Sequence, residues 1–215
     1  MNCLAEQAPI DPFTIDIIVS EWMGYFLLFE RMLPSVLSVR DRCLKPGGVI
    51  VPARVKILLG AASFSEKPKS IILRDLAGVV TLNPDIIKVK EEEIISTTQE
   101  VLNLCLLEAP KDFDSFESDF ELTIKKDCEV NGLVGWFDAE MTEGVWFRTS
   151  PNEGDTHWHQ TVFPLIESVS SVENDVLRGN IKVRPIPEDH RGLHITISIA
   201  SKIEPQGQTL EYLIR

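Results

Sequence analysis

Two glutamates, Glu21 and Glu30, flank the aromatic-rich segment SEWMGYFLLFE, and this pair is the first feature of the sequence that could carry chemistry. Two carboxylates in an apolar setting can hold a guanidinium group, whose N–H donors match carboxylate oxygens in a planar fork. A guanidinium is not deprotonated in proteins, so a nucleophilic nitrogen must arise by orienting the group and polarising its charge. A second interpretation stays open, in which Glu21 caps a turn and Glu30 is a solvated helix residue.

The second feature is Thr156-His157-Trp158, in a turn that follows the acidic loop PNEGD. The face of an indole can bind a cation, and a histidine beside it could contribute a polar contact. The simpler interpretation is a hydrogen-bonded structural histidine and a tryptophan that packs against the core. Neither motif decides the function alone.

The elements that position the first motif form a short α/β unit. IDIIVS, residues 15–20, is typical of a buried parallel strand. A helix is expected from about Pro34 to Leu44, because a proline is tolerated only in the first turn, and Lys45-Pro46-Gly47-Gly48 is expected to end it. GVIVP would be the next strand. This order places Glu21 at the carboxyl end of a strand, where open α/β sheets bind ligands.

The rest of the chain has the alternating pattern of antiparallel strands, which predicts a β-sandwich or β-barrel. Residues 68–93 interrupt this pattern and are expected to form an arm that is helical at least in part. The alternating apolar positions are Val55, Ile57 and Leu59; Leu102, Leu104 and Leu106; Ile181 and Val183; and Ile195, Ile197 and Ile199.

Composition excludes several classes of protein. The 215 residues include 21 Lys and Arg against 33 Asp and Glu, and this net charge of −12 disfavours nucleic-acid binding and favours basic partners. No apolar run is long enough for a membrane helix, and the N-terminus lacks the features of a signal peptide. The four widely spaced cysteines predict reduced thiols, no metal site, and a cytoplasmic or nuclear location.

An acidic stretch runs from Glu108 to Glu121. It is interpreted either as a solvated face or as a surface that steers arginine-rich segments, and both interpretations stay open. Its carboxylates are Glu108, Asp112, Asp114, Glu117, Asp119 and Glu121.

The glycines do not form a nucleotide-binding turn, since neither Gly47-Gly48 nor Gly132 and Gly135 fall between a strand and a helix N-terminus. A single strand–helix–strand unit is also too small a sheet to stand alone. We therefore expect the chain to begin in the middle of a domain.

In combination, SEWMGYFLLFE and THWHQTVF resemble the protein arginine methyltransferases, in which they correspond to the double-E loop and the THW loop. The flanking segments IDIIVSEWMGY, KPGGVIVP and GLHITISIAS agree, so the resemblance extends from about Ile15 to the C-terminus. The segment FLLFE is most similar to the corresponding segment of the type I enzymes, which make asymmetric dimethylarginine.

The resemblance implies roles for the residues of both motifs. Glu21 and Glu30 would grip the substrate guanidinium, with Glu30 drawing charge away from the attacking nitrogen, and His157 would complete the catalytic set. Methyl transfer would then depend on positioning and electrostatics. The implied substrate-binding residues are Trp22, Met23, Tyr25 and Trp158.

The resemblance also implies a mixed α/β and then mainly β fold. Residues 1–52 would be the last strand–helix–strand of a Rossmann-type cofactor domain. Residues 53–215 would be the substrate-binding β-barrel, with its dimerisation arm at about 68–93 and the THW loop at 156–158. The S-adenosylmethionine site would be largely absent, so this chain alone is expected to be inactive.

The expected partners are Arg/Gly-rich or histone-like basic proteins and a second subunit in a homodimer, with no nucleic acid and no membrane. The alternative function is a non-catalytic acidic β-barrel module that binds or assembles Arg-rich proteins. A third hypothesis, that Glu21 and Glu30 serve as a glycosidase pair, has little support from nearby aromatic residues.

Overall fold

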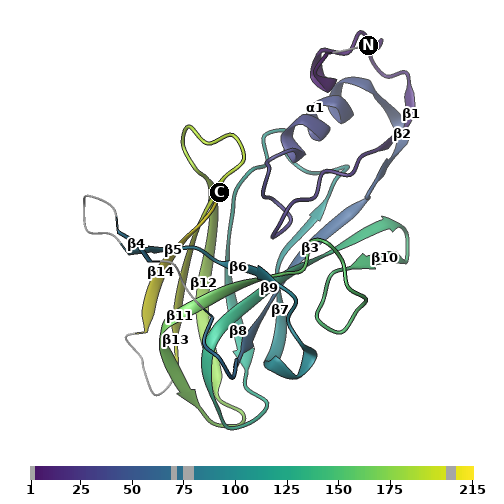
Figure 1. Ribbon diagram of the computed structural model, residues 1–215. Helices are drawn as coiled ribbons and strands as arrows, with labels where there is room; N and C mark the ends of the chain where they lie inside the picture. Colours follow the sequence, from purple (N-terminus) through teal and green to yellow (C-terminus); the bar gives the residue numbers. More distant parts are fainter. Residues whose placement is uncertain (1–2, 69–71, 75–79, 202–206) are drawn as a thin grey trace.

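The computed structural model describes residues 3–68, 72–74, 80–201 and 207–215. One small α/β unit lies at one end of two larger sheets that share a core (Figure 1). The described chain is therefore mostly β-structure, with one α-helix.

The small unit contains a short 3-10 helix η1 (Ala5–Gln7), strand β1 (Ile15–Val19), helix α1 (Leu33–Cys43) and strand β2 (Leu44–Val51). β1 and β2 are parallel. Pro34 lies in the first turn of α1, as predicted, and basic residues occupy its last turn, where they complement the helix dipole. The expected stop at Lys45–Gly48 is wrong, because the helix ends at Cys43 and those four residues belong to β2.

The first large sheet has the order β6-β11-β9-β3-β7, with β10 paired to β9. Its pairings are antiparallel, as the alternating sequence pattern predicts. The strands are β3 (Arg54–Ala62), β6 (Asp85–Ile87), β7 (Ile94–Cys105), β9 (Cys128–Thr142), β10 (Val145–Arg148) and β11 (Gln160–Ser171).

The second large sheet has the order β4-β5-β14-β13-β12-β8 and is antiparallel except between β14 and β5. Its strands are β4 (Ile72–Arg74), β5 (Val80–Leu82), β8 (Phe116–Thr123), β12 (Val176–Pro185), β13 (Leu193–Ala200) and β14 (Gln208–Ile214).

The two sheets meet on two sides, at the edge strands β7 and β8 and between β14 and β11, which gives the predicted barrel. On one side the N–H of Lys125 donates to the carbonyl of Ile95 at 2.8 Å, next to a bridge between Ser96 and Ile124. On the other side the hydroxyl of Tyr212 in β14 donates to the carbonyl of Pro164 in β11 at 2.8 Å.

The expected arm, residues 68–93, is only partly described. Residues 72–74, 80–82 and 85–87 are the short strands β4, β5 and β6, and Glu91–Glu93 form a 3-10 turn, η2. Helical structure in the described part of the arm is thus limited to the single 3-10 turn η2, with no α-helix there, and residues 69–71 and 75–79 lie outside the described residues. The expected boundary after residue 52 falls between β2 and β3 and stays a prediction.

No helix among the described residues is both long and apolar enough to cross a membrane.

Candidate functional site

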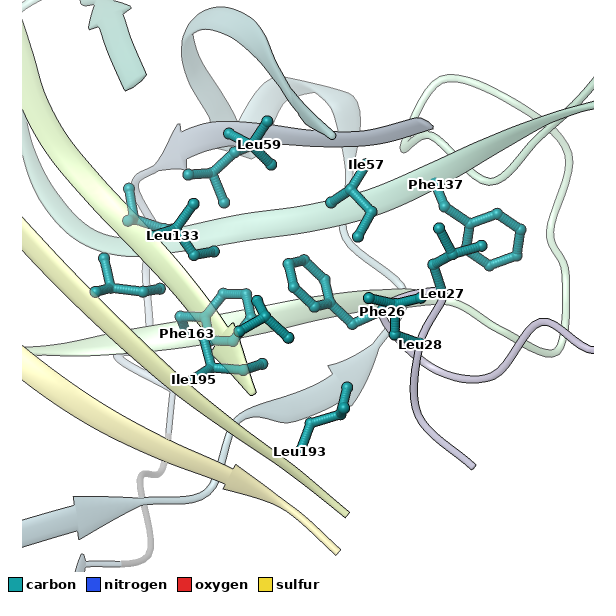
Figure 2. Close-up of a cluster of buried hydrophobic side chains, with 14 of the residues drawn as sticks. Phe26, Leu27, Leu28, Ile57, Leu59, Leu133, Phe137, Phe163, Leu193 and Ile195 are labelled. Carbon is teal, nitrogen blue, oxygen red and sulfur yellow. The ribbon is translucent and has the colours of Figure 1, made fainter. Parts of the chain in front are cut away.

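The connection from β1 to α1, residues 20–32, contains the first predicted motif and inserts apolar side chains into one end of the barrel. Phe26, Leu27 and Leu28 are buried, and Figure 2 shows them among Phe137, Phe163, Leu193 and other core residues. The ring of Phe26 packs edge-to-face on Phe163, with centroids 5.2 Å apart. This insertion fixes the motif to the barrel through hydrophobic burial.

Two glycines make this insertion possible. A Cβ at Gly135 of β9 would lie 2.3 Å from the ring of Phe26, so only glycine leaves space for that side chain. A Cβ at Gly24 would lie 2.0 Å from the carbonyl oxygen of Phe29, where the loop folds back on itself. The loop also holds non-glycine residues with positive φ, namely Phe26, Leu27, Glu30 and Arg31, which are uncommon backbone conformations.

With the apolar residues inside, the polar side chains of the loop face outward. Glu21 is exposed, and its side chain makes no hydrogen bond or ion pair with the described residues. Tyr25 is also exposed and stacks on the ring of Phe29, with centroids 5.9 Å apart. Glu21 is therefore available to a ligand.

Glu30 has a partner from the opposite end of the sequence. Its Oε1 accepts a hydrogen bond from Nη2 of Arg191 at 2.6 Å, and its backbone N–H donates to the carbonyl of Arg191 at 3.0 Å. The structure thus places Glu30 at the barrel rim, where one carboxylate oxygen is engaged.

The second predicted motif meets the first at Trp158. The Nε1–H of Trp158 donates to the carbonyl of Met23 at 2.7 Å. The indole packs edge-to-face on Phe137 and Phe147, with centroids 5.5 and 5.4 Å apart. Residues 20–30 and 156–158, distant in sequence, therefore lie together at one end of the barrel.

The remaining predicted residues have different exposures. His157 is exposed, and its ring centroid lies 3.8 Å from that of Trp158. Met23 and Trp22 are buried at 7% and 1% exposure, so they support the motif from within the core. Nε1 of Trp22 has no hydrogen-bond partner among the described residues.

Comparison with known proteins shows the family. The model described as "Arginine methyltransferase oligomerization subdomain" matches residues 66–204. The chain belongs to the protein arginine methyltransferase family. The relatives that it matches are named as methyltransferases, so the family is enzymatic.

Two relatives illustrate the extent of the match. Protein arginine N-methyltransferase 1 of Chlamydomonas reinhardtii is 35% identical over 96% of this chain and 64% of its own length. The Schizosaccharomyces pombe protein of the same name is 34% identical over 96% of this chain and 65% of its own length. The chain thus spans less than two thirds of the length of these relatives.

Solved structures agree on the fold. The Trypanosoma brucei PRMT1 enzyme–prozyme heterotetrameric complex with AdoHcy superposes with a TM-score of 0.88 at 24% identity, over 99% of this chain and 72% of that chain. Arabidopsis thaliana protein arginine methyltransferase 10, in an open conformation, superposes with a TM-score of 0.83 at 23% identity, over 99% of this chain and 74% of that chain.

Three residues at this candidate site were not predicted from the sequence. Arg191 contacts the double-E loop at Glu30. Arg31 follows Glu30 in the sequence, and its Nη1 donates to the carbonyl of Asp189 at 3.0 Å. In the THW turn, the histidine beside an acid is His159, whose Nδ1 lies 3.4 Å from Oδ1 of Asp155. Nothing local in the segment PIPEDHRG, which contains Arg191, indicates which loop it contacts.

The acidic stretch has its own partners across the sheet. Nζ of Lys182 lies 2.7 Å from Glu117, and Nε of Arg178 lies 2.7 Å from Glu121, both between β12 and β8. Asn180 donates to Asp119 at 2.8 Å. This pairing favours the solvated-face interpretation for the β8 part of the stretch.

A cavity of about 740 Å³ lies outside both motifs. Its lining includes Trp136, Asp138, Arg148 and Glu153, and none of the predicted site residues. Burial raises the pKa of Asp138, against the opposing effect of Arg148, whose Nε lies 3.5 Å away. We place the candidate site at the two loops because the motif residues meet there.

Proposed function

We propose that this chain provides the arginine-binding side of a protein arginine methyltransferase. The reaction would transfer a methyl group from S-adenosylmethionine to a guanidinium nitrogen of a protein arginine, with asymmetric dimethylarginine as the product. The observation that carries this proposal is the hydrogen bond from Trp158 to Met23, which joins the double-E and THW loops into one site.

The carboxylates have a defined task in this proposal. Glu21 is exposed, and Glu30 keeps one oxygen beyond its contact with Arg191, so both can accept N–H groups of a substrate guanidinium. Gripping the group from two sides orients one nitrogen and draws positive charge away from it. Trp158, Tyr25 and His157 would border the bound side chain, over the buried Met23 and Trp22.

The loop from β1 to α1 does not fit S-adenosylmethionine. The loop from β1 to α1 has one glycine, Gly24, and the space beside its Cα is filled by the carbonyl of Phe29. It therefore leaves no cradle for a cofactor, and we derive no step through that group. We propose that the 215-residue chain alone does not transfer methyl groups.

Assembly and substrates follow from the same proposal. The matched oligomerisation subdomain includes the arm at residues 68–93, and we propose that this arm contacts a second subunit in a homodimer. Arg/Gly-rich or histone-like basic proteins are the proposed substrates, in keeping with the net charge of −12. Comparing the mass in solution with and without residues 68–93 tests the dimer contact.

The alternative is a non-catalytic module that assembles with or binds Arg-rich proteins. The match to an oligomerisation subdomain is the observation that favours it. It predicts binding of basic proteins without methyl transfer under any condition, whereas the enzyme proposal predicts transfer once a cofactor domain is supplied.

The test is labelled methyl transfer from S-adenosylmethionine to an Arg/Gly-rich peptide. The chain would be assayed alone and then with a separately produced S-adenosylmethionine-binding methyltransferase domain added in trans. We expect transfer only after complementation, its loss in Glu30→Gln, and its retention in the exposed control Glu121→Gln. Transfer that survives Glu30→Gln would refute the assignment.

A further inference from the structure

The turn between β12 and β13, residues 186–192, contacts the double-E loop at Glu30. Arg191 bonds to Glu30 twice, through Nη2 to the carboxylate at 2.6 Å and through its carbonyl to the backbone N–H at 3.0 Å. One residue therefore fixes both the side chain and the backbone of Glu30. Figure 1 shows the turn projecting toward the α1 unit.

This turn is well defined by its own hydrogen bonds. Oδ1 of Asp189 accepts from the N–H groups of Arg191 and Gly192, each at 2.9 Å. A Cβ at Gly192 would lie 2.4 Å from Oδ2 of Asp189, so a larger residue there would displace the side chain that holds the turn. Arg31 then ties the turn to the double-E loop through the carbonyl of Asp189.

The guanidinium of Arg191 is itself held in place. It lies over the ring of Phe29, with its Cζ 5.4 Å from the ring centroid, a favourable position for a cation. Phe29 is buried and stacks on Tyr25, so the ring is a firm support. Arg191 thus has a fixed direction from which to engage Oε1 of Glu30.

We propose that Arg191 is a positioning residue for Glu30: it occupies Oε1 and thereby directs Oε2 toward the substrate guanidinium. This inference rests on the function proposed above. The side chains of Arg191 and Glu30 are 64% and 39% exposed, and an ion pair this exposed contributes little to folding. Its loss should therefore change ligand binding and leave the fold intact.

The opposite role for Arg191 makes the opposite prediction. If its guanidinium merely occupied the substrate position, removing it would free Glu30 and strengthen binding of an arginine ligand. If Arg191 positions Glu30, removing it leaves the carboxylate free to rotate. Binding then weakens, because ordering the Glu30 side chain on binding costs free energy.

The experiment titrates the ¹⁵N-labelled full chain with a blocked Gly-Arg-Gly peptide and follows the indole N–H of Trp158 and the amide of Glu30. The variants are Arg191→Ala, Arg191→Lys and Glu30→Gln. Arg178→Ala is the matched control, because Arg178 is also 64% exposed and pairs with Glu121 at 2.7 Å, but on the β12–β8 face.

We expect Arg191→Ala to bind the peptide about fivefold more weakly than the wild type, a loss at the upper end for one exposed charge pair. Arg191→Lys should recover part of the affinity, Arg178→Ala should match the wild type, and all should keep the same unfolding midpoint. Unchanged or tighter binding by Arg191→Ala would overturn the positioning role.

The controls separate the two proposals. Loss of binding in Glu30→Gln supports the guanidinium site whatever the result for Arg191→Ala. The positioning role of Arg191 can therefore be refuted while the guanidinium site is supported. A wild-type chain that does not bind the peptide, or binding that Glu30→Gln leaves unchanged, would overturn both.

Discussion

The indole of Trp158 donates to the carbonyl of Met23, and this 2.7 Å hydrogen bond connects the two motifs through residues that lie 135 positions apart. The ring of Trp158 is at the same time packed against Phe137 and Phe147 of the barrel. The THW loop is therefore anchored to the core on one side and to the double-E loop on the other. Both loops should respond to a change at this one contact.

Trp158→Phe keeps an aromatic ring and removes the N–H donor. We expect it to lower the free energy of unfolding by about 1 kcal/mol, because the carbonyl of Met23 loses its partner. It should also weaken binding of an arginine peptide. Urea unfolding measures the first effect, and Trp146→Phe on β10 is the control, since its indole N–H bonds to none of the described residues. Equal losses in both variants would contradict the prediction.

Gly135→Ala tests the insertion of the double-E loop. The new Cβ would lie 2.3 Å from the ring of Phe26, which must move out of the barrel end. We expect destabilisation by about 2 kcal/mol, as for other overpacked cores, with displacement of the amide resonances of residues 20–31. Gly154→Ala is the matched control, because nothing lies within 4 Å of a Cβ at that position. A stable Gly135→Ala variant with unshifted loop resonances would refute the account.

The turn that contains Arg191 should depend on pH through Asp189. Hydrogen bonds from the N–H groups of Arg191 and Gly192 lower the pKa of Asp189 below its ordinary value of 3.8. Since the folded-state pKa is the lower one, the stabilisation is present above the ordinary value and is lost as pH falls through the folded value. Amide shifts of Arg191 and Gly192 should change with a midpoint below 3.8. Asp189→Asn should abolish that transition. A midpoint at or above 3.8 in the wild-type chain would contradict the lowered pKa of Asp189.

The acidic stretch should contribute little to ligand binding through its β8 part. Glu117 and Glu121 are already paired with Lys182 and Arg178. We expect Glu117→Gln with Glu121→Gln to change the affinity for an Arg/Gly-rich peptide by less than about twofold at physiological ionic strength. A larger loss, relieved by added salt, would instead support electrostatic steering.

The elements that sequence predicted well are those with a strong local pattern. Val55, Ile57 and Leu59 alternate in the sequence and are fully buried in β3, because a strand with one face on the core needs that period. Pro34 located the start of α1 for an equally local reason. The end of α1 was misplaced, because Leu44 pairs with Ile15 of the parallel neighbour strand and Lys45 forms an ion pair with Asp16 of that strand, so tertiary contacts overrode the glycine signal.

The sequence predicted the residues of the two motifs at the candidate site, but it did not predict the contacts that these residues make. Glu21, Glu30, His157 and Trp158 were all named from sequence, but the partner of Glu30 was not. Arg191 reaches Glu30 only because β12 ends and β13 begins beside the double-E loop, and a contact between residues 161 positions apart leaves no local pattern. The need for glycine at position 135 likewise could not be predicted, because it arises from the contact with Phe26, which is distant in the sequence.

The central claim is that Glu21 and Glu30 together grip a guanidinium group. The most direct test is calorimetric titration of the chain with a blocked Gly-Arg-Gly peptide and with its citrulline counterpart, which has the same shape and no charge. We predict that only the arginine peptide binds, and that Glu21→Gln and Glu30→Gln each weaken it, while Glu121→Gln does not. Equal binding of the citrulline peptide, or arginine binding unchanged in both site variants, would contradict the account.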